Sequence, residues 1–504
     1  MKRTHPLGLL SAALLGGAML ATLCQCGDDG PADAGPTAAG AQPAAAKAPQ
    51  DPEPPPTVLG DRVHVILSGN MHGHLEPCGC ASGQLGGLPR RLVYLQEIHR
   101  PDLLIEGGNL AGGSNALDLE KAFTAVQVLF GMQPETHYDA LGTGPQDLEL
   151  PLDAWGQLLQ AYDAPVLAAD LEAGSGDAPF QPRAFVEKDV RDTKVRVVSL
   201  VMSLPEALAN REPAPLRLLD PAAGWARGLE GAADATLRML LAHTSPERAR
   251  QLAAELQPKP DVLVCVHDSV HEPLAEPEYR ADVPIVHPGT RGRFVVDFWF
   301  GRAASGGAIP RYDLVPLRGS ETKPDAGQDP AVKEMLRQHR VYVAEEGLRE
   351  KLARQRPTAN GHSYVGNATC GSCHQTDYQL WKNSKHGGAW ATLERAEKDP
   401  TRYGWPVTKY PDCVGCHTVG YGEETGFLNP TETPELADVG CERCHGPGSA
   451  HSKDPLGARM GRVGDGVPSA VCTQCHDFEQ SPDFDYMRRW PMIQHGQTKA
   501  VRPK

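Results

Sequence analysis

The sequence predicts a chain with two folded parts: an α/β sandwich over residues 59–318 and a mostly helical or irregular domain over residues 359–504. Two observations carry this prediction. Apolar runs of strand length alternate with helical periodicity in the first part, and eight of the thirteen cysteines gather at regular spacing in the last third of the chain. A length of 504 residues also exceeds what one hydrophobic core usually supports, so more than one domain is expected.

The first 26 residues have the features of an export signal. Lys2 and Arg3 precede an apolar run over residues 7–23, which is shorter than a convincing membrane span. Cys24 and Cys26 follow directly, and a cysteine in this place resembles the lipid-modified residue of bacterial lipoproteins. We therefore expect a periplasmic or cell-surface protein that a lipid holds to a bacterial membrane, with a plain secreted protein as the alternative.

Residues 27–58 are predicted to be a disordered tether. Ala, Pro, Gly and Asp dominate this segment and cannot bury enough apolar surface to fold. The whole chain is acidic, with a net charge of −14. Nucleic-acid binding requires clustered basic side chains, so this balance argues against a nucleic-acid partner and leaves small molecules or other proteins.

Residues 59–318 alternate between runs of strand length and helical segments. Polar or glycine-rich turns follow several of the runs, at the positions where α/β proteins usually place their binding sites. The predicted strands are Val63–Leu67, Leu103–Ile105, Val195–Val201, Met239–Ala242 and Val262–Val266, and two of the predicted helices are Leu119–Phe130 and Glu247–Leu256.

The cysteines of the last third form four copies of the motif Cys-x-x-Cys-His. Two thiols three residues apart can form thioethers with the two vinyl groups of one haem, and the adjacent histidine can bind that haem's iron. A zinc ribbon or disulfides are the alternatives, but neither requires a histidine after every second cysteine. The sequence thus predicts four covalently bound haem c groups, at Cys370, Cys373 and His374; Cys413, Cys416 and His417; Cys441, Cys444 and His445; and Cys472, Cys475 and His476.

Four more histidines lie beyond residue 359: His362, His386, His451 and His495. Each is a candidate distal ligand, and a solvent-facing side chain is the alternative for each. Two histidine ligands give a low-spin haem that transfers electrons, whereas a missing distal ligand leaves an iron that can bind a small molecule. The leading interpretation is an electron carrier between a donor and an acceptor redox protein. The second is an enzyme that acts on a small nitrogen, oxygen or sulfur compound at an open haem.

Three segments of the C-terminal part resemble the tetrahaem cytochrome c family that accepts electrons from hydroxylamine oxidoreductase in ammonia-oxidising bacteria. They are residues 370–386 (CGSCHQTDYQLWKNSKH), 413–420 (CVGCHTVG) and 439–448 (VGCERCHGPG). The resemblance implies distal ligation by His386 and His451 and one haem without a sixth protein ligand. This chain is shorter after its fourth motif than expected for the family, which leaves the role of His495 open.

The turns of the N-terminal part resemble, in chain order, the motifs of the metallophosphoesterase and 5′-nucleotidase family. Only His72, His243 and His267 keep the family's ligand types. Two neighbouring divalent cations need anionic bridging ligands, and Asn70 and Asn109 cannot supply that charge. The resemblance therefore implies a hydrolase fold retained as a binding or docking module, with retained phosphoester hydrolysis as the alternative. The matching segments are residues 68–73 (SGNMHG), 107–109 (GGN), 144–147 (GPQD), 241–243 (LAH) and 267–269 (HDS).

The segment Leu75-Glu76-Pro77-Cys78-Gly79-Cys80 does not belong to that pattern. Soft thiolates together with imidazoles can bind one zinc or copper ion. A disulfide from Cys265 to Cys78 or Cys80, or buried thiols, is the alternative. The hypothetical second metal site would draw on His72, Cys78, Cys80, His243, Cys265 and His267.

Residues 319–358 are predicted to connect the two parts. The stretch from Ala331 to Arg354 is charged and helical in period, and its apolar residues could lie against either domain while the charged residues face water. Those apolar residues are Leu336, Val341, Val343 and Leu348.

Overall fold

The computed structural model describes residues 62–77, 79, 83–98, 100–132, 136–174, 180–303, 306–319, 327–399, 403–460 and 468–495. The predicted export signal, lipid-modified cysteine and tether lie outside these residues. Residues 59–504 form one compact unit. Within its described residues, no helix has both the length and the apolar character needed to span a bilayer.

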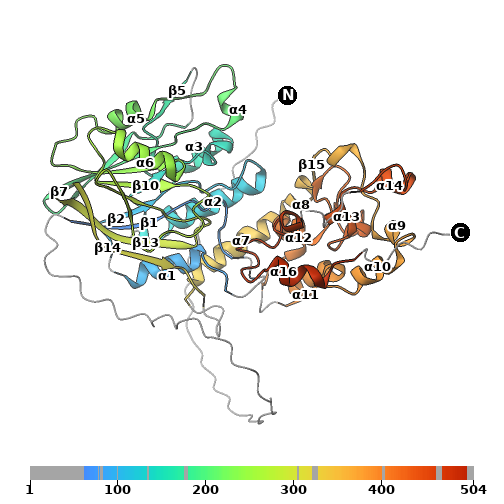
Figure 1. Ribbon diagram of the computed structural model, residues 1–504. Coiled ribbons are helices and arrows are strands. Elements are labelled where there is room, and N and C mark those ends of the chain that lie inside the picture. Colours follow the sequence, from blue (N-terminus) through green and yellow to red (C-terminus); the bar gives the residue numbers. More distant parts are fainter. Residues whose placement is uncertain are drawn as a thin grey trace, which may run out of the picture. The chain divides into compact units, whose positions relative to one another are not determined.

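The first sheet of the N-terminal part has six strands in the order β14-β13-β1-β2-β3-β4 (Figure 1). Strands β1, β2, β3 and β4 are parallel to one another. Strand β13 pairs antiparallel with β1, and β14 pairs antiparallel with β13 at the edge of the sheet. The strands are β1 (Val63–Ser68), β2 (Leu103–Glu106), β3 (Ala140–Gly142), β4 (Val166–Leu167), β13 (Phe294–Ala303) and β14 (Gly306–Pro316).

The second sheet also has six strands, in the order β11-β12-β10-β9-β7-β6. Strands β7, β9, β10 and β12 are parallel, and β6 and β11 pair antiparallel at the two edges. The strands are β6 (Phe185–Val190), β7 (Thr193–Leu200), β9 (Leu237–His243), β10 (Val262–Val266), β11 (Glu278–Arg280) and β12 (Val283–Val286), and a separate small pair joins β5 (Leu171–Ala173) to β8 (Leu216–Leu218).

Three apolar layers hold these sheets together. Inward-facing side chains of both sheets, such as Val65 and Met239, meet in one core. A second core lies between the first sheet and helices α1 (Leu88–Glu97), α2 (Ala116–Gly131) and α3 (Leu152–Ala161), and a third joins the second sheet to α5 (Pro221–Gly228) and α6 (Pro246–Glu255). The predicted α/β sandwich is therefore confirmed, with helices on both outer faces.

All the strands and helices named from the sequence are present, and their ends differ by only a few residues. Local chemistry sets several of these ends. Helix α2 begins at Ala116 because the Asn115 side chain accepts from two backbone N–H groups and Asp118 completes a capping box. Helix α6 likewise begins after Ser245, whose hydroxyl accepts from the N–H of Arg248.

The connecting stretch forms α7 (Pro330–Glu345) and α8 (Leu348–Leu352). Its apolar side chains serve both parts of the unit. Leu336 packs into the core beneath α1 and α2, while Val343 and Leu348 belong to the core of the C-terminal part, and Val341 lies beside them partly buried.

The C-terminal part is mostly helical or irregular, as predicted. Among the described residues its apolar core includes Trp390, Trp405, Tyr410 and Phe427. A short parallel sheet joins β15 (Arg354–Arg356) to β16 (Gly422–Glu423), and an isolated bridge pairs Thr418 with Ala437. The helices are α9 (Asn367–Gly371), α10 (Gln375–Lys382), α11 (Ala389–Lys398), α12 (Pro411–His417), α13 (Cys441–His445), α14 (Ser449–Lys453), α15 (Pro468–Cys472) and α16 (Tyr486–Arg489).

Candidate functional site

The four Cys-x-x-Cys-His motifs lie on or at the ends of short helices. Side chains three residues apart share one face of a helix, so the two thiols of a motif point to the same side. All twelve motif residues line one cavity of about 2520 Å³. Ordinary small-molecule pockets measure roughly 300–1000 Å³, so this cavity has room for several large groups.

The lining of the cavity suits an apolar prosthetic group. Leu380, Leu456 and Met492 are 55%, 92% and 69% exposed, which is unusual for large apolar side chains, and all three line this cavity. Exposed apolar surface of this kind marks a place where a partner or ligand binds. The residues present therefore fit several covalently attached haems, whose faces would cover these side chains.

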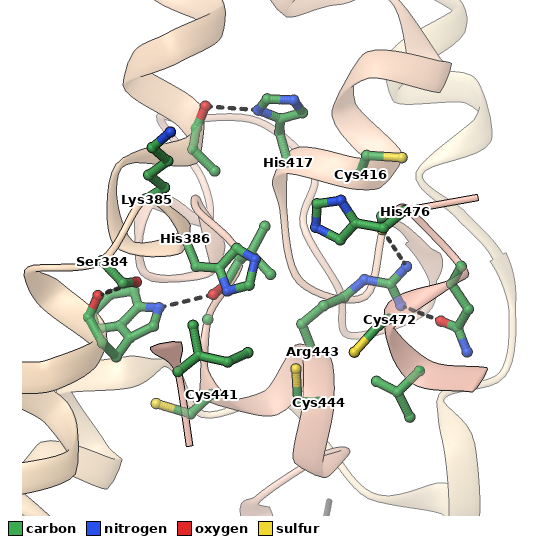
Figure 2. A pocket seen from close by; sticks show the side chains of 18 of the residues that line it. Ser384, Lys385, His386, Cys416, His417, Cys441, Arg443, Cys444, Cys472 and His476 are labelled. Carbon is green, nitrogen blue, oxygen red and sulfur yellow. Dashed lines mark hydrogen bonds between the residues drawn. The ribbon is translucent and has the colours of Figure 1, made fainter. Parts of the chain in front are cut away.

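Three of the four motif histidines face a second imidazole. The ring centroids are 6.2 Å apart for His374 and His451, 6.2 Å for His386 and His476, and 5.8 Å for His445 and His495. When two imidazoles bind one metal ion from opposite sides, the distance between their ring centroids is the sum of two metal–nitrogen bonds and two nitrogen-to-centroid distances. The bonds take roughly 2 Å each, and the two nitrogen-to-centroid distances together take about 2 Å. The observed separations therefore allow one iron between each pair. Figure 2 shows His386 and His476 on facing sides of the cavity.

His417 differs from the other motif histidines. Within the described residues, no second imidazole lies against its ring, and its Nδ1–H donates to the carbonyl oxygen of Ala389 at 2.7 Å. This hydrogen bond leaves Nε2 as the metal-binding atom. His362 was predicted from the sequence as a possible distal ligand. It is exposed, and no other imidazole lies against its ring in the part of the chain that the structure describes.

Backbone carbonyls orient two of the candidate distal histidines in the same way. Nδ1 of His451 donates to the carbonyl of Ala458 at 2.8 Å, and Nδ1 of His495 donates to that of Ile493 at 2.9 Å. Burial lowers the pKa of His386, which favours the neutral imidazole that a metal requires.

The motifs are grouped in space differently from their order in the chain. The thiols of Cys370 and Cys441 are close enough to raise or lower each other's pKa, and so are those of Cys416 and Cys475. The first motif therefore neighbours the third, and the second neighbours the fourth. Sequence spacing carries no signal for this arrangement.

The α/β part forms one wall of the cavity, which the sequence did not predict. His72, His74, Glu76, Asp118 and Lys121 all line it. Around the second motif, Nζ of Lys121 on α2 pairs with Asp412 Oδ2 on α12 at 2.6 Å, and His339 Nε2 on α7 lies 3.2 Å from the Tyr410 hydroxyl. Arg340 on α7 pairs with Glu76 and lies 4.7 Å from the Trp405 ring centroid.

A second set of contacts fixes the segment that follows the fourth motif. Glu479 is 3% exposed, and its two carboxylate oxygens lie 3.0 Å from His74 Nδ1 and 2.8 Å from Arg291 Nη1. Arg291 also pairs with Asp477 at 2.6 Å, and Gln84 Nε2 donates to the Glu479 carbonyl at 2.9 Å. Burial alone would raise the pKa of Glu479, but the hydrogen bond and charge of His74 and the Arg291 guanidinium outweigh it and hold that pKa below its usual value. We call these residues the Glu479 clamp.

The turns that resemble metallophosphoesterase motifs lie close together, at the carboxyl ends of the strands that precede them. Asn109 Nδ2 donates to Asn70 Oδ1 at 3.0 Å, so the two amides that replace carboxylates bind each other. His72 hydrogen-bonds Gln146 through Nδ1, and its Nε2 lies 2.6 Å from Asp268. Asn70, His72 and Asn109 all have positive φ, at 58°, 50° and 52°, which is a strained backbone typical of functional turns.

The histidine of β9 is the most deeply buried ring of this cluster. His243 is 5% exposed, and neither ring nitrogen makes a hydrogen bond of good geometry in the described structure. Burial lowers its pKa to about 4, and a weaker backbone interaction with Gly107 opposes that shift. The dinuclear metal centre of the phosphoesterase family does not fit here, since the amides of Asn70 and Asn109 offer no bridging anions.

The hypothetical soft metal site remains a proposal. Cys78 and Cys80 lie outside the described residues. Cys265 packs in the core beneath α6, its thiol donates to the carbonyl of Thr244 at 3.2 Å, and burial raises its pKa to about 12. Nδ1 of His267 lies 2.7 Å from the Ser269 hydroxyl, and no three His, Cys, Asp or Glu side chains of the described ranges are arranged to hold a metal ion.

Comparison with known sequences matches the C-terminal part. Residues 369–446 match the family described as cytochrome c554 and c-prime, a stretch that includes the first three motifs. Over 94 residues the chain is 37% identical to cytochrome c-554 of Nitrosomonas europaea, which covers 17% of this chain and 39% of that protein. The chain therefore spans well under half the length of this relative.

Solved structures align with the α/β part. They include the NAD nucleotidase NadN of Haemophilus influenzae (14% identity, TM-score 0.45, 61% of this chain and 64% of that one) and the calcineurin-like phosphoesterase YfkN of Bacillus subtilis (18% identity, TM-score 0.42, 55% of this chain and 96% of that one). The two sheets themselves, rather than these likenesses, establish the sandwich.

The resemblance predicted for the C-terminal part is thus confirmed on its first three motifs. That part of the chain is similar to cytochrome c-554 and carries covalently bound haem c, and it follows an α/β sandwich in the same compact unit.

Proposed function

We propose that this chain is an exported electron carrier with four covalently bound haem c groups, which receives electrons from one redox protein and passes them to another. Haem c supplies reversible one-electron chemistry when bound. The observation that carries the proposal is the set of three imidazole pairs across one cavity, at 5.8–6.2 Å between ring centroids.

We further propose that His451, His386 and His495 are the distal ligands paired with His374, His476 and His445, respectively. Ligation by two imidazoles suits electron transfer because neither coordination position changes when the iron changes oxidation state. His362 then has no ligand role. The first motif lies beside the third and the second beside the fourth, and Arg443 of the third motif contacts Gln474 and Cys475 of the fourth. The four motifs are therefore neighbours in the order first, third, fourth and second, which supports electron movement along the whole set.

One observation favours a second candidate function. His417 has no facing imidazole among the described residues, so the haem at Cys413 and Cys416 would have an open position for a small nitrogen, oxygen or sulfur compound. The wall of the cavity near this motif contains Lys121, Arg340 and Glu76 from outside the C-terminal part, so polar groups are available there to bind such a ligand.

Low-temperature EPR of the oxidised, haem-loaded protein separates these functions. The proposal predicts three low-spin haems with two imidazole ligands and one high-spin haem. If carbon monoxide or nitric oxide binds one haem per chain, the second candidate remains open alongside the first. A fully low-spin protein that binds neither gas would exclude the second candidate, and a fully high-spin protein would contradict the electron carrier.

We propose that the α/β part acts as a binding or docking module rather than as a phosphoesterase. Two observations support this. Asn70 and Asn109 hydrogen-bond each other at positions where a dinuclear centre needs anionic ligands. His72 already contacts Gln146 and Asp268, so its ring nitrogens are not free to bind a metal. Turnover of a nucleotide ester together with two bound divalent metals per chain would contradict it.

We also propose that the protein is periplasmic or on the cell surface and is anchored by a lipid at Cys24 or Cys26. The apolar run that precedes these cysteines supports the proposal, as does haem attachment, which takes place outside the cytoplasm. Detection of a diacylglyceryl-modified N-terminal peptide in the mature protein tests it. An unmodified peptide that starts beyond Cys26 would refute the anchor and leave export intact.

A further inference from the structure

Arg443 occupies the place where the second, third and fourth motifs meet. It lies within the third motif, between Cys441 and Cys444. From α13 its side chain reaches the fourth motif, where Nη1 donates to Gln474 Oε1 at 3.1 Å and Nη2 lies 3.7 Å from Cys475 Sγ. Figure 2 shows Arg443 among Cys416, Cys444, Cys472 and His476.

The Arg443 side chain is partly buried, and its guanidinium has few partners. Its Nε is buried without a hydrogen-bond acceptor, and none of the described ion pairs includes Arg443. The adjacent Glu442 cannot serve, because its carboxylate already accepts from the backbone N–H groups of Val365, Gly366 and Gly448.

The electrostatic reach of Arg443 covers three motifs. Arg443 precedes Cys444 of the third motif in the chain, its Nη2 lies 3.7 Å from Cys475 Sγ of the fourth motif, and Figure 2 shows Cys416 of the second motif in the same part of the cavity. Reduction of a ferric haem adds one negative charge to it, and a nearby fixed cation stabilises the state with the added electron.

We propose that Arg443 is the fixed cation that sets the reduction potentials of the haems at the third and fourth motifs, holding them above the values they would have without it. The proposal deepens the tetrahaem electron carrier proposed above and rests on it. Arg443 is a positioning residue in this role, because it acts on the haems through its charge and need not bind iron. Electrons would accordingly collect on the haems nearest to it.

The test is an optical and EPR redox titration of the haem-loaded full chain, for the wild type and the variants Arg443→Gln, Arg443→Lys and Arg395→Gln. At a fixed potential, Arg443→Gln should lower the ratio of reduced to oxidised haem at least tenfold for one or both affected haems, which corresponds to a midpoint about 59 mV lower. Arg443→Lys keeps the charge and should keep the midpoints near those of the wild type. Arg395 is exposed on α11 and bonds only Thr392 among the described contacts, so Arg395→Gln controls for the loss of a surface charge.

Equal midpoints in Arg443→Gln and Arg395→Gln would overturn the proposal. If Arg443→Gln fails to bind four haems, Gln474→Glu decides instead, because a carboxylate at the position of the present amide oxygen, 3.1 Å from the guanidinium, would cancel its charge. Lower midpoints in Gln474→Glu would support the role of Arg443, and unchanged midpoints would overturn it. The haem count by intact mass is measured first: fewer than four haems in the wild type would refute the proposed tetrahaem carrier, independently of any midpoint.

Discussion

The Glu479 clamp gives the sharpest prediction about how the α/β part and the haem-binding part depend on each other. Arg291→Met removes the guanidinium from two carboxylates, those of Asp477 and Glu479, which lie 2.6 and 2.8 Å from it. Loss of one partner from a buried ion pair costs about 3–5 kcal/mol. Glu479 keeps His74, and Asp477 is 23% exposed, so we expect the lower end, about 3 kcal/mol.

The matched control is Arg293→Met. Both guanidinium groups lie 4.8 Å from the Phe478 ring centroid, so each variant loses that cation–π contact, which is worth about 0.5–1 kcal/mol. Arg293 also lies 5.2 Å from the Phe294 ring centroid and donates to the backbone carbonyl of His271, and it has no carboxylate partner among the described ion pairs. The extra cost of Arg291→Met over Arg293→Met therefore comes from the ion pairs of Arg291, and it should be about 2 kcal/mol.

Urea unfolding of the haem-loaded protein measures this, with the Soret absorbance as the signal for the haem-binding part. Urea is uncharged and leaves ion pairs unscreened. We expect a lower transition midpoint with an unchanged slope for Arg291→Met, which would indicate a loss of stability without a change in the surface exposed. Equal shifts for Arg291→Met and Arg293→Met would refute the reasoning, because the carboxylates would then contribute nothing.

Three further predictions follow from the same contacts. His386→Ala should convert the haem at His476 from low-spin to high-spin, whereas His362→Ala should leave every EPR signal unchanged; a new high-spin signal in both would refute the assigned pairing. Because the folded pKa of Glu479 lies below the unfolded value of about 4.3, its stabilisation is complete above roughly pH 5 and is lost as pH falls through the depressed folded value. Urea unfolding at a series of pH values from 7 downward should therefore show that the free-energy cost of Glu479→Gln decreases as pH falls below about 4.3, and a cost that does not change with pH would contradict this. Added Mn²⁺ should elicit no hydrolysis of nucleotide esters, because Asn70 supplies no anionic ligand, and turnover well above a metal-only blank would argue otherwise.

The sequence was sufficient for the fold class because the relevant signals are local. Apolar runs such as Val262–Val266 are long enough to be strands, and the predicted range is the observed one. The signal for the proposed attachment residues is equally local, since each motif is two cysteines and a histidine within five positions. The helix ends were less well predicted, because caps such as Asn115 decide them and lie outside the apolar pattern.

The pairing of ligands could not be read from the sequence. His386 lies twelve positions beyond the first motif's His374, yet its ring faces His476 of the fourth motif, and His451 faces the first. His495 faces His445, fifty positions earlier. Such long-range pairs depend on how short helices pack around the haems, and no periodicity in the chain records that packing.

The contribution of the α/β part to the cavity was also beyond sequence reasoning. Nothing near Lys121 or His74 in the chain points to Asp412 or Glu479, and only the fold brings them to those residues, roughly 300 and 400 positions later. Arg443 could not be singled out from the sequence for a related reason. It fills a variable position of its motif, and its importance comes only from the three motifs that surround it in space.

The central claim is the covalent attachment of one haem at each Cys-x-x-Cys-His motif, and peptide mass spectrometry of the mature protein tests it most directly. We predict that the four peptides containing Cys370, Cys413, Cys441 and Cys472 each carry the added mass of one haem. Peptides with free thiols, disulfides or zinc at these positions would contradict the account, because the cavity and its imidazole pairs would then have no iron to bind.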